Sequence, residues 1–391
     1  MHVIKDPIHK DITISNFEMS IIDTNEMQRL RNIKQLGPTS LVYPSAVHTR
    51  FEHSIGVMHI AEKIAQAIKL NNQTTKELKI AALMHDIGHL PYSHINRIEN
   101  MNLKATKKDH MDIGIDKIKT NYSSLLEKHN INTNNVCNLI KGKDPIGAIL
   151  SSGIDIDKMD YLVRDAYFTG TAYGTIDLSR LISTATYNKK TFGFLSKGIK
   201  NVESVVISRY LMFSAVYQHD VIEIAMEMLG RSVQNLCDNK ILNLNDLKNM
   251  DDADLITLIR RNKEKLGILI DQRKILKSIN NIHENELDNK TKENCIKLSK
   301  NPTLLKETEK LIAKELKLKN DEFLIRIRSF PKSIENTQIY ENNNFVELKS
   351  ISPLTKTLEK ESKQEWKIML ISKENKKSLG LKAKKLFLKN I

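Results

Sequence analysis

The segment ALMHDIGHLPYSH, residues 82–94, gathers imidazole and carboxylate side chains that can do chemistry together. His85 and Asp86 are adjacent, and His89 follows one helical turn after His85. Imidazole and carboxylate together suit a borderline divalent ion such as manganese, iron, nickel or zinc. On a helix, the two neighbouring side chains would lie about 100° apart, so both can reach one ion at that edge. Alone, the pair is a weak signal, because most His-Asp pairs in helices bind nothing.

Two other segments supply the remaining candidate ligands. His53 lies in HTRFEHSIG, and Asp157 lies in the acid-rich GIDIDKMDYLVRD. We therefore predict one metal site whose ligands come from separate helices: His53, His85, Asp86 and Asp157. Such a set leaves coordination positions for water and substrate, as a catalytic metal requires. Several weak signals in this order are more specific than any one of them.

The chain has 391 residues and a net charge of +14. This charge favours a polyanionic partner, which can be nucleic acid, a phosphorylated metabolite or an anionic membrane surface. The alternative is that abundant lysine, asparagine and isoleucine reflect an AT-rich genome, with most lysines on solvated faces. Charge therefore supports a phosphate-bearing ligand without choosing one.

Cysteine usage and hydropathy indicate the compartment. Cys137, Cys237 and Cys295 are scattered and form no CxxC pair, which argues against a disulfide framework or a cysteine zinc site. The start MHVIKDPIHK has no apolar signal-peptide core, and no apolar run is long enough to span a bilayer. We expect a cytoplasmic protein with no membrane partner.

The hydrophobic periodicity predicts a mainly α-helical architecture with a short N-terminal hairpin and a small α+β C-terminal appendage. Residues 1–16 read as a short hairpin, and 24–36 as a helix capped by Asp23 or Thr24. A helix opened by a threonine cap carries the His-Asp pair, and 96–112 read as a loop over the site. Helices follow over 113–128, 132–142, 154–168 and 202–236.

Beyond residue 240 the composition becomes charge-dense. Helical periods are clear over 252–266 and 304–318, and strand-like pieces at 322–330, 344–351 and 366–372 suggest one small sheet. Residues 378–391 read as a closing helix. We predict a catalytic domain over 1–240 and a charged helical and small-sheet region over 241–391, packed on the core.

Six sequence blocks resemble one known family. DPIHKDITI, IIDTNEMQRLRNIKQLG, HTRFEHSIGVMHIA, AALMHDIGHLPYSH, GIDIDKMDYLVRDAYFTG and YQH are similar to the dNTP triphosphohydrolases of the HD superfamily. The similarity is greatest to the branch typified by the SAM-and-HD-domain dNTPase, and bacterial dGTPases are more distant. It is dense over residues 3–235 and diffuse beyond, and no SAM domain precedes it.

The resemblance implies hydrolysis of a deoxynucleoside triphosphate to deoxynucleoside and inorganic triphosphate. It implies one divalent metal per site (Mn, Fe, Zn, Ni or Mg) on His53, His85, Asp86 and Asp157, and a second Mg with the substrate phosphates. His89 and His110 match histidines beside the scissile α-phosphate. Matches to substrate-holding groups are Arg50, His94, Lys158 and Arg209 for the triphosphate, Gln35, Tyr161 and Asp165 for the sugar, Leu36 and Tyr217 near the 2′ position, and Gln218 near the base.

These assignments make chemical sense. A triphosphate carries about four negative charges, which cations must offset before a nucleophile can approach. Arginine grips phosphate bidentately, and histidine titrates near neutrality, so His89 and His110 can donate to the 5′-oxygen or orient water. Several of these residues also have a structural alternative to the functional role. In these alternatives, His94 only braces the turn after Pro91, Lys158 is a surface lysine, Tyr161 and Tyr217 are core aromatics, and the match of Arg209 is shifted by one helical turn.

The sequence departs from the family pattern at two places in the pocket. The family places an aspartate shortly after the SH dipeptide to pair with the histidine matching His110. Here Arg97 stands near that position, and Glu99 is the substitute we expect. Phe213 replaces a histidine of the eukaryotic relative.

A second nucleotide site and an oligomer are also implied. Asp23, Gln28 and Arg31 match residues that read a guanine base at an activating site of the resembled branch. Ala215 and Asp220 replace an arginine and a lysine there, so we expect a homo-oligomer (dimer or tetramer) with different or reduced nucleotide activation. The alternative is a capping aspartate with two exposed polar residues.

Two other functions compete with dNTP hydrolysis. The first is an HD phosphodiesterase or nucleotidase acting on monophosphates or signalling nucleotides. The second is a basic nucleic-acid-binding protein with secondary hydrolase activity. The number of predicted triphosphate-holding cations argues against the first, and intact metal ligands argue against the second.

Overall fold

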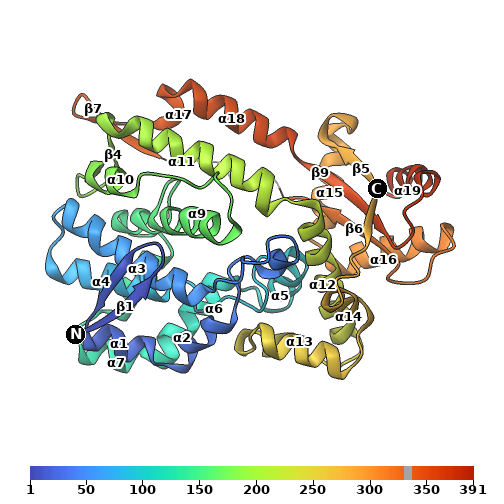
Figure 1. Ribbon diagram of the computed structural model, residues 1–391, viewed down its shortest axis with the longest axis horizontal. Helices are drawn as coiled ribbons and strands as arrows, with labels where there is room; N and C mark the ends of the chain where they lie inside the picture. The colour runs from blue at the N-terminus through green and yellow to red at the C-terminus, as the bar shows by residue number, and fades with distance from the viewer. Residues whose placement is uncertain (330–336) are drawn as a thin grey trace.

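The computed structural model describes residues 1–329 and 337–391. The chain is mainly helical, with an N-terminal hairpin and two further small sheets (Figure 1). The hairpin pairs β1 (His2–Asp6) with β2 (Lys10–Ile14) in antiparallel register. It packs through Ile12 and Ile14, which are fully buried, so the predicted hairpin is confirmed.

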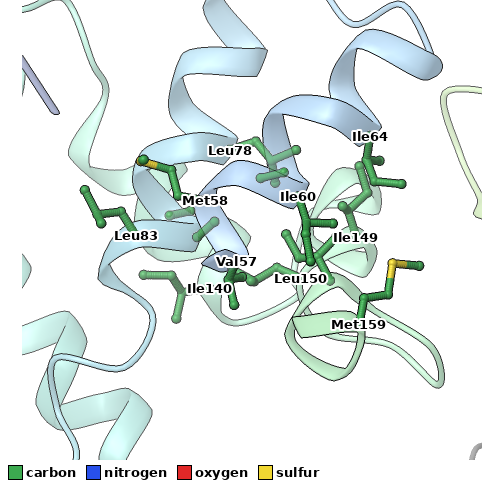
Figure 2. Packing of buried hydrophobic residues seen from close by; sticks show 14 of the residues in the cluster. Val57, Met58, Ile60, Ile64, Leu78, Leu83, Ile140, Ile149, Leu150 and Met159 are labelled. Carbon is green, nitrogen blue, oxygen red and sulfur yellow. The ribbon is translucent and has the colours of Figure 1, made fainter. Parts of the chain in front are cut away.

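A bundle of helices forms the core that holds the candidate site. Its centre is α3 (Arg50–Ala67), with α4 (Asn72–Met84), α8 (Thr133–Ile140) and α9 (Ile156–Thr169) around it. Figure 2 shows aliphatic side chains from these helices meeting, among them Val57 and Ile60 of α3, Leu83 of α4 and Met159 of α9. Each is at most 1 % exposed, and burial of such side chains stabilises the fold by about 1.5–3 kcal/mol each. The core therefore fixes the helices that carry the predicted ligands.

Helix α4 is shorter than its sequence pattern predicts. Asn71, not a threonine, caps it, since the Asn71 side chain accepts a hydrogen bond from the Thr74 amide. The helix ends at Met84, and two tight turns follow, in which the Ile87 amide donates to Met84 and the His89 amide to Asp86. His85 and Asp86 therefore lie in the turn after the helix, not on its face.

The segment before α3 is also less regular than predicted. Helix α1 (Asn16–Ile22) ends at Asp23, and α2 (Asn25–Arg29) begins after Thr24. Two 3₁₀ helices follow, Leu30–Asn32 and Gly37–Leu41, so no single helix spans 24–36. The predicted apolar face is nevertheless buried through Met27, Leu30 and Ile33.

Residues 96–112 do not form the loop that their polarity suggested. Most of this stretch is α5 (Asn96–Thr106), and α6 (His110–Lys117) starts at its end. A π-helical turn at Ile118–Tyr122 leads into α7 (Ser123–Lys128). Arg97 explains the difference, because its 2 % exposed side chain anchors α5 through buried hydrogen bonds to Glu227, Gln234 and Glu309.

The predicted helix over 202–236 is divided in two. It comprises α11 (Ile199–Met212), a π-helical turn at Phe213–Tyr217 and α12 (Asp220–Asp238). Before it the chain forms α10 (Leu178–Thr184) and the short strands β3 (Ala185–Tyr187) and β4 (Phe192–Leu195), which the sequence pattern did not indicate.

The C-terminal region has the predicted helical periods. Its helices are α13 (Asp252–Arg261), α14 (Lys265–Asp271), α15 (Asn289–Ser299), α16 (Pro302–Glu315), α17 (Leu348–Ile351), α18 (Pro353–Gln364) and α19 (Lys377–Lys389). Helix α19 confirms the closing helix, whose predicted first residue is 378.

The three strand-like pieces do not form one sheet. Strands β6 (Phe323–Ile327) and β9 (Lys367–Ser372) pair with β5 (Lys277–His283) in the order β5-β9-β6. Strand β8 (Asn344–Glu347) instead joins β7 (Gln338–Glu341), β4 and β3. Residue 330, at the end of the first predicted piece, lies outside the described residues. Because β7 pairs in parallel with β4, strands from both sides of residue 240 share a sheet, and the domain division there stays a prediction.

Helices α17 and α18 return along α11 at the top of Figure 1, while β5, β6, β9, α16 and α19 lie at the right. In the part of the chain that the structure describes, no helix is both long and apolar enough to cross a membrane.

Candidate metal and substrate site

Three predicted ligands meet where α3, the turn after α4 and the first turn of α9 converge. One ligand atom each from His53, His85 and Asp157 lies within 4.8 Å of the others. Asp157 Oδ1 is 2.9 Å from His53 Nε2 and 3.8 Å from His85 Nε2. Asp157 stands at the start of α9, whose cap residue Asp155 accepts from the Lys158 amide, so the helix start sets its position.

The fourth predicted ligand, Asp86, lies against the same centre. Its Oδ1 is 3.2 Å from His85 Nε2, and its Oδ2 is 3.8 Å from His53 Nε2. The 4 % exposed Asp86 also accepts a hydrogen bond of 2.6 Å from Arg50 Nη1. The structure thus brings all four predicted side chains together.

Hydrogen bonds behind the two histidines fix which nitrogen faces the centre. His53 Nδ1 lies 2.8 Å from Asp160 Oδ2, and His85 Nδ1 lies 2.7 Å from the Ala82 carbonyl oxygen. Both partners are acceptors, so each Nδ1 carries a proton and each Nε2 faces the centre, where it can bind a metal in place of a proton. Gly56 permits this packing, since a Cβ there would lie 2.0 Å from Asp160 Oδ1.

The cluster strongly favours a positive charge at its centre. Burial alone would lower the pKa of His53, but its hydrogen bonds to Asp157 and Asp160 outweigh burial and raise the pKa to about 10. Burial would raise the pKa of Asp157, whereas His53 and His85 hold it well below its usual range. A site that binds a proton this tightly can bind a divalent cation in its place.

The donor set fits a borderline divalent metal. His85 Nε2 is buried and has no hydrogen-bond partner among the residues that the structure describes, as suits a nitrogen that binds a metal. Two imidazole nitrogens and two carboxylates suit manganese, iron, nickel or zinc. Magnesium prefers oxygen ligands and suits this set less well.

Three more histidines line a cavity beside the cluster. The cavity of about 200 Å³ is bordered by His89, His94 and His110. His89 and His110 stack with ring centroids 4.3 Å apart, and His89 Nε2 is 3.2 Å from Asp86 Oδ1. Gly88 makes this stacking possible, because a Cβ there would lie 2.0 Å from the His110 carbonyl oxygen.

Arg50 joins the metal cluster to this cavity. Besides Asp86, the 2 % exposed guanidinium contacts Ser93 Oγ at 2.6 Å and His94 Nε2 at 2.9 Å. His94 has a φ of +60° and Tyr92 a φ of +53°, so both hold a left-handed conformation that costs energy outside glycine. The turn is held by the Tyr92 amide, which donates to Asp252.

The imidazoles of His89 and His110 favour the neutral form. Burial lowers the pKa of His89 well below its ordinary value, and the nearby charge of Arg50 adds to this. Burial, with the charge of His94, also lowers the pKa of His110. Glu99, the expected partner of His110, instead lies 3.6 Å from His94 Nδ1. Burial would raise the pKa of Glu99, but the hydrogen bond to His94 lowers it to about 2.

Two predicted phosphate-holding groups lie on other elements. Lys158, in the first turn of α9, donates to Asp155 Oδ2 at 2.6 Å and to the Ser152 carbonyl at 3.0 Å. Arg209 of α11 is 8 % exposed, and its guanidinium carbon lies 4.8 Å from the Phe213 ring centroid. Its Nε is buried and has no hydrogen-bond partner in the described part of the chain.

The predicted sugar-binding residues form a connected group. Asp165 Oδ2 accepts a hydrogen bond of 2.7 Å from the Tyr217 hydroxyl, and the rings of Tyr161 and Tyr217 are 6.3 Å apart. Asp165 Oδ1 lies 2.7 Å from His48 Nε2, and the backbone N–H of Gln35 donates to the His48 carbonyl oxygen. Leu36 is half-buried against the apolar core.

Three predicted substrate-binding residues and His48 carry unpaired polar atoms. Gln35 Oε1, His48 Nδ1, Arg209 Nε and Gln218 Oε1 are buried without a hydrogen-bond partner among the described residues. Leaving such an atom unpaired costs about 1–3 kcal/mol. A polar ligand that contacts these residues would pair such atoms.

The residues predicted for an activating nucleotide lie on or near α2. Arg31 Nε donates to Gln28 Oε1 at 2.8 Å, and the Arg31 guanidinium lies over the Phe51 ring at 3.7 Å. Gln28 Nε2 donates to the Ile22 carbonyl. Asp23 is the exposed residue that ends α1, and Thr24, not Asp23, stands at the N-cap of α2.

Two residues at the site were not singled out from sequence. Asp160 accepts from His53, His9 and Arg164, and His48 contacts Asp165. A signal existed for Asp160, because it lies three residues after Asp157, on nearly the same helix face. His48 stands two residues before Arg50, within the quoted motif HTR, but its type alone does not distinguish it from a core histidine.

Comparisons with known proteins identify two matching family models. The HD domain family matches residues 50–165, and the HD associated region matches residues 176–389. An uncharacterized protein from Methanocaldococcus jannaschii is 38 % identical over 381 residues, covering 96 % of this chain and 80 % of that protein.

Named relatives match a shorter part of the chain. The deoxynucleoside triphosphate triphosphohydrolase SAMHD1 homolog of Dictyostelium discoideum is 34 % identical over 242 residues, covering 56 % of this chain and 46 % of that protein. SAMHD1 of Danio rerio is 30 % identical, covering 59 % and 44 %. The chain thus spans less than half the length of either named triphosphohydrolase.

A solved structure matches the whole chain. A hypothetical protein from Aquifex aeolicus superposes with a TM-score of 0.77 at 27 % identity, covering 98 % of this chain and 99 % of that one. A Bacteroides thetaiotaomicron phosphohydrolase, at 21 % identity and a TM-score of 0.76, shows the same fold.

Proposed function

Because this chain belongs to the HD family of phosphohydrolases, we propose that it hydrolyses deoxynucleoside triphosphates to deoxynucleoside and inorganic triphosphate with a bound divalent metal. The observation that carries the proposal is the placement of the His-Asp cluster. His89 and Arg50 lie against Asp86 of the cluster. Helix α9 carries Asp157 of the cluster and, one and two turns later, Tyr161 and Asp165 of the predicted sugar-binding group. Two relatives named as dNTP triphosphohydrolases support the substrate class.

His53, His85, Asp86 and Asp157 would hold the metal, which supplies Lewis-acid polarisation of the α-phosphate and activation of water. Arg50, already beside Asp86 and His94, binds phosphate oxygens with its planar guanidinium. Lys158 and Arg209 offset further charge on the triphosphate. A second magnesium would travel with the phosphates of the substrate.

His89 and His110 have different proton roles in this proposal. His89 is buried against Asp86, so its neutral imidazole orients the attacking water. His110 borders the cavity and is only partly buried, so it can take up a proton from solvent and, as imidazolium, give it to the departing 5′-oxygen. Glu99 holds His94, which completes the wall of the cavity.

The sugar is selected by a polar and an apolar contact. Asp165 and the side chain of Gln35 bind the 3′-hydroxyl, and Tyr161 packs beside them. Leu36 and Tyr217 occupy the space that a 2′-hydroxyl needs, so ribonucleotides are excluded by sterics. Gln218, at the end of the π-helical turn, contacts the base.

The wider biology belongs to the same proposal. The enzyme acts in the cytoplasm as a homo-oligomer, a dimer or tetramer. A nucleotide at Asp23, Gln28 and Arg31 modulates it less than in the resembled branch, because Asp220 brings a negative charge where that branch has a lysine. Rates measured against added GTP, with sedimentation alongside, test this part, and complete independence from nucleotide would remove the effector.

The central experiment identifies substrate and product together. Purified protein is incubated with each dNTP, NTP and dNMP in the presence of Mn²⁺ or Mg²⁺, and phosphate, pyrophosphate and triphosphate are separated. We expect triphosphate from dNTPs alone, and none from an Asp157→Asn variant that stays folded. Turnover of monophosphates or phosphodiesters, with dNTPs left intact, would instead identify an HD nucleotidase or phosphodiesterase.

A further inference from the structure

A second, larger cavity lies away from the metal cluster. It has a volume of about 390 Å³ and is formed by the C-terminal half of α12, the turn between α13 and α14, and α16. These helices lie at the right of Figure 1, whereas α3, α4 and α9 lie at the left. Small-molecule sites usually have volumes of about 300–1,000 Å³, so the cavity is large enough for one ligand.

The carboxylates of this cavity are already engaged by neighbouring donors. Glu264 accepts from the Gly267 amide at 2.8 Å and from Asn235 Nδ2 at 3.2 Å. Asp321 accepts from Arg231 Nη1 at 3.2 Å and from the same Asn235 amide at 3.1 Å. Both carboxylates keep their negative charge and offset part of the positive charge around them.

Lysines line the cavity in excess of these acids. They come from three segments and are Lys263, Lys265, Lys306 and Lys310. Lys306 donates to Asp238 Oδ2 at 2.6 Å, and Lys265 is 3.8 Å from Glu322. Lys263 and Lys310 are exposed and have no ion pair or hydrogen bond to any residue that the structure describes. Two ammonium groups thus have no counterion.

The surroundings of Lys306 also favour loss of its proton. Burial lowers the pKa of Lys306, and the charge of Arg231 adds to the effect despite the hydrogen bond to Asp238. Arg231 itself is 1 % exposed and is ion-paired with Glu309 and Asp321, so it adds no unpaired cation. The cavity's own lysines outnumber its two carboxylates, Glu264 and Asp321, and an anion would offset the charge that remains.

We propose that this cavity binds a compact polyphosphate anion, such as the triphosphate group of a nucleotide. Several ammonium groups around a small concave space suit closely spaced phosphates, and Asn235 and Asn262 add amide groups for hydrogen bonds. An extended nucleic-acid backbone would instead need a groove that continues beyond the cavity. The proposal concerns a second site and holds whether or not the metal site hydrolyses dNTPs.

Calorimetric titration of the full chain with inorganic triphosphate tests the proposal. The test variant is Lys263→Ala/Lys310→Ala, and Lys314→Ala is the matched control, since Lys314 is exposed on the same helix one turn beyond Lys310. An Arg50→Ala variant removes binding at the proposed catalytic site and isolates the second one. Because the two test lysines are exposed and unpaired, their removal should leave the melting temperature unchanged.

In the Arg50→Ala background we expect one binding event, weakened about tenfold or more by the double substitution, which is about 1.4 kcal/mol. The Lys314→Ala change should leave it within twofold. Affinity that is equal with and without Lys263 and Lys310 would overturn the proposal. The proposal would also be overturned if a single-stranded DNA oligonucleotide bound more tightly than triphosphate and lost as much affinity on the double substitution. The lysines would then belong to a surface that follows a nucleic-acid strand.

Discussion

Replacing Asp160 with asparagine should weaken metal binding without touching a ligand. Asp160 is fully buried, and its two oxygens accept hydrogen bonds from four donors. Oδ2 serves His53 Nδ1 at 2.8 Å and Arg164 Nε at 2.8 Å, and Oδ1 serves His9 Nε2 at 2.6 Å and Arg164 Nη2 at 2.9 Å. Asparagine keeps one oxygen, turns an amino group toward a donor and removes the negative charge.

The expected magnitude follows from these contacts. Loss of a partner that orients a ligating histidine lowers metal affinity about 10–100-fold, or about 1.4–2.7 kcal/mol. Breaking a buried ion pair costs about 3–5 kcal/mol of folding stability. We expect the lower end here, because Arg164 retains Asp6 at 2.8 Å.

The assay is competition between the protein and a chelator for Mn²⁺ or Zn²⁺, with circular dichroism to establish folding. Asp177→Asn is the matched control, because its side chain caps α10 by accepting from the Arg180 amide, a role that asparagine can also fill. A folded Asp160→Asn protein whose metal affinity stays within twofold of the wild type would show that His53 does not depend on Asp160 for its orientation.

Three further outcomes can be measured. Leu36→Gly should admit ribonucleotides to some degree, and unchanged discrimination in turnover assays would remove the steric explanation of sugar choice. Arg97→Leu should lower the free energy of unfolding by about 3–5 kcal/mol in urea titrations, because it leaves buried Glu227 and Glu309 without this partner, while the same change at exposed Arg261 should cost under about 0.5 kcal/mol. Burial raises the pKa of Asp252 to about 6, so the folded chain binds this proton more tightly than the unfolded chain. The protonated carboxyl therefore contributes to the free energy of unfolding below pH 3.8, its ordinary pKa, and this contribution is lost as the pH rises through 6. Asp252→Asn should flatten that part of the stability profile. A variant with the wild-type slope between pH 4 and 6 would contradict this assignment.

The sequence was most informative where residue type alone carries the chemistry. His53, His85, Asp86 and Asp157 could be proposed from their types and order, and the structure brings their side chains together. Helix existence was also predictable from apolar periodicity, as at α9, α12 and α16. These features depend on local pattern, which a single sequence contains.

Features that depend on distant partners could not be predicted. The sheet that joins β4 to β7 pairs residues more than 140 positions apart, and each strand is too short to give a clear alternation. Helix α5 was read as a loop because Arg97 counts as a surface residue until Glu227 and Glu309 are known to be its neighbours. The early end of α4 is set by the tight turns after Met84, which leave His85 and Asp86 facing the cluster.

The distance between the imidazoles of His89 and His110 depends on the absence of a side chain at Gly88. The backbone of α6 rests directly on Gly88, so any side chain there must push His110 outward and open its contact with His89. Under the proposed function, Gly88, a residue outside the contacts with metal and nucleotide, would determine how closely His110 approaches the 5′-oxygen. A substitution at Gly88 would lower the measured activity as loss of a catalytic group does, although it would only displace His110.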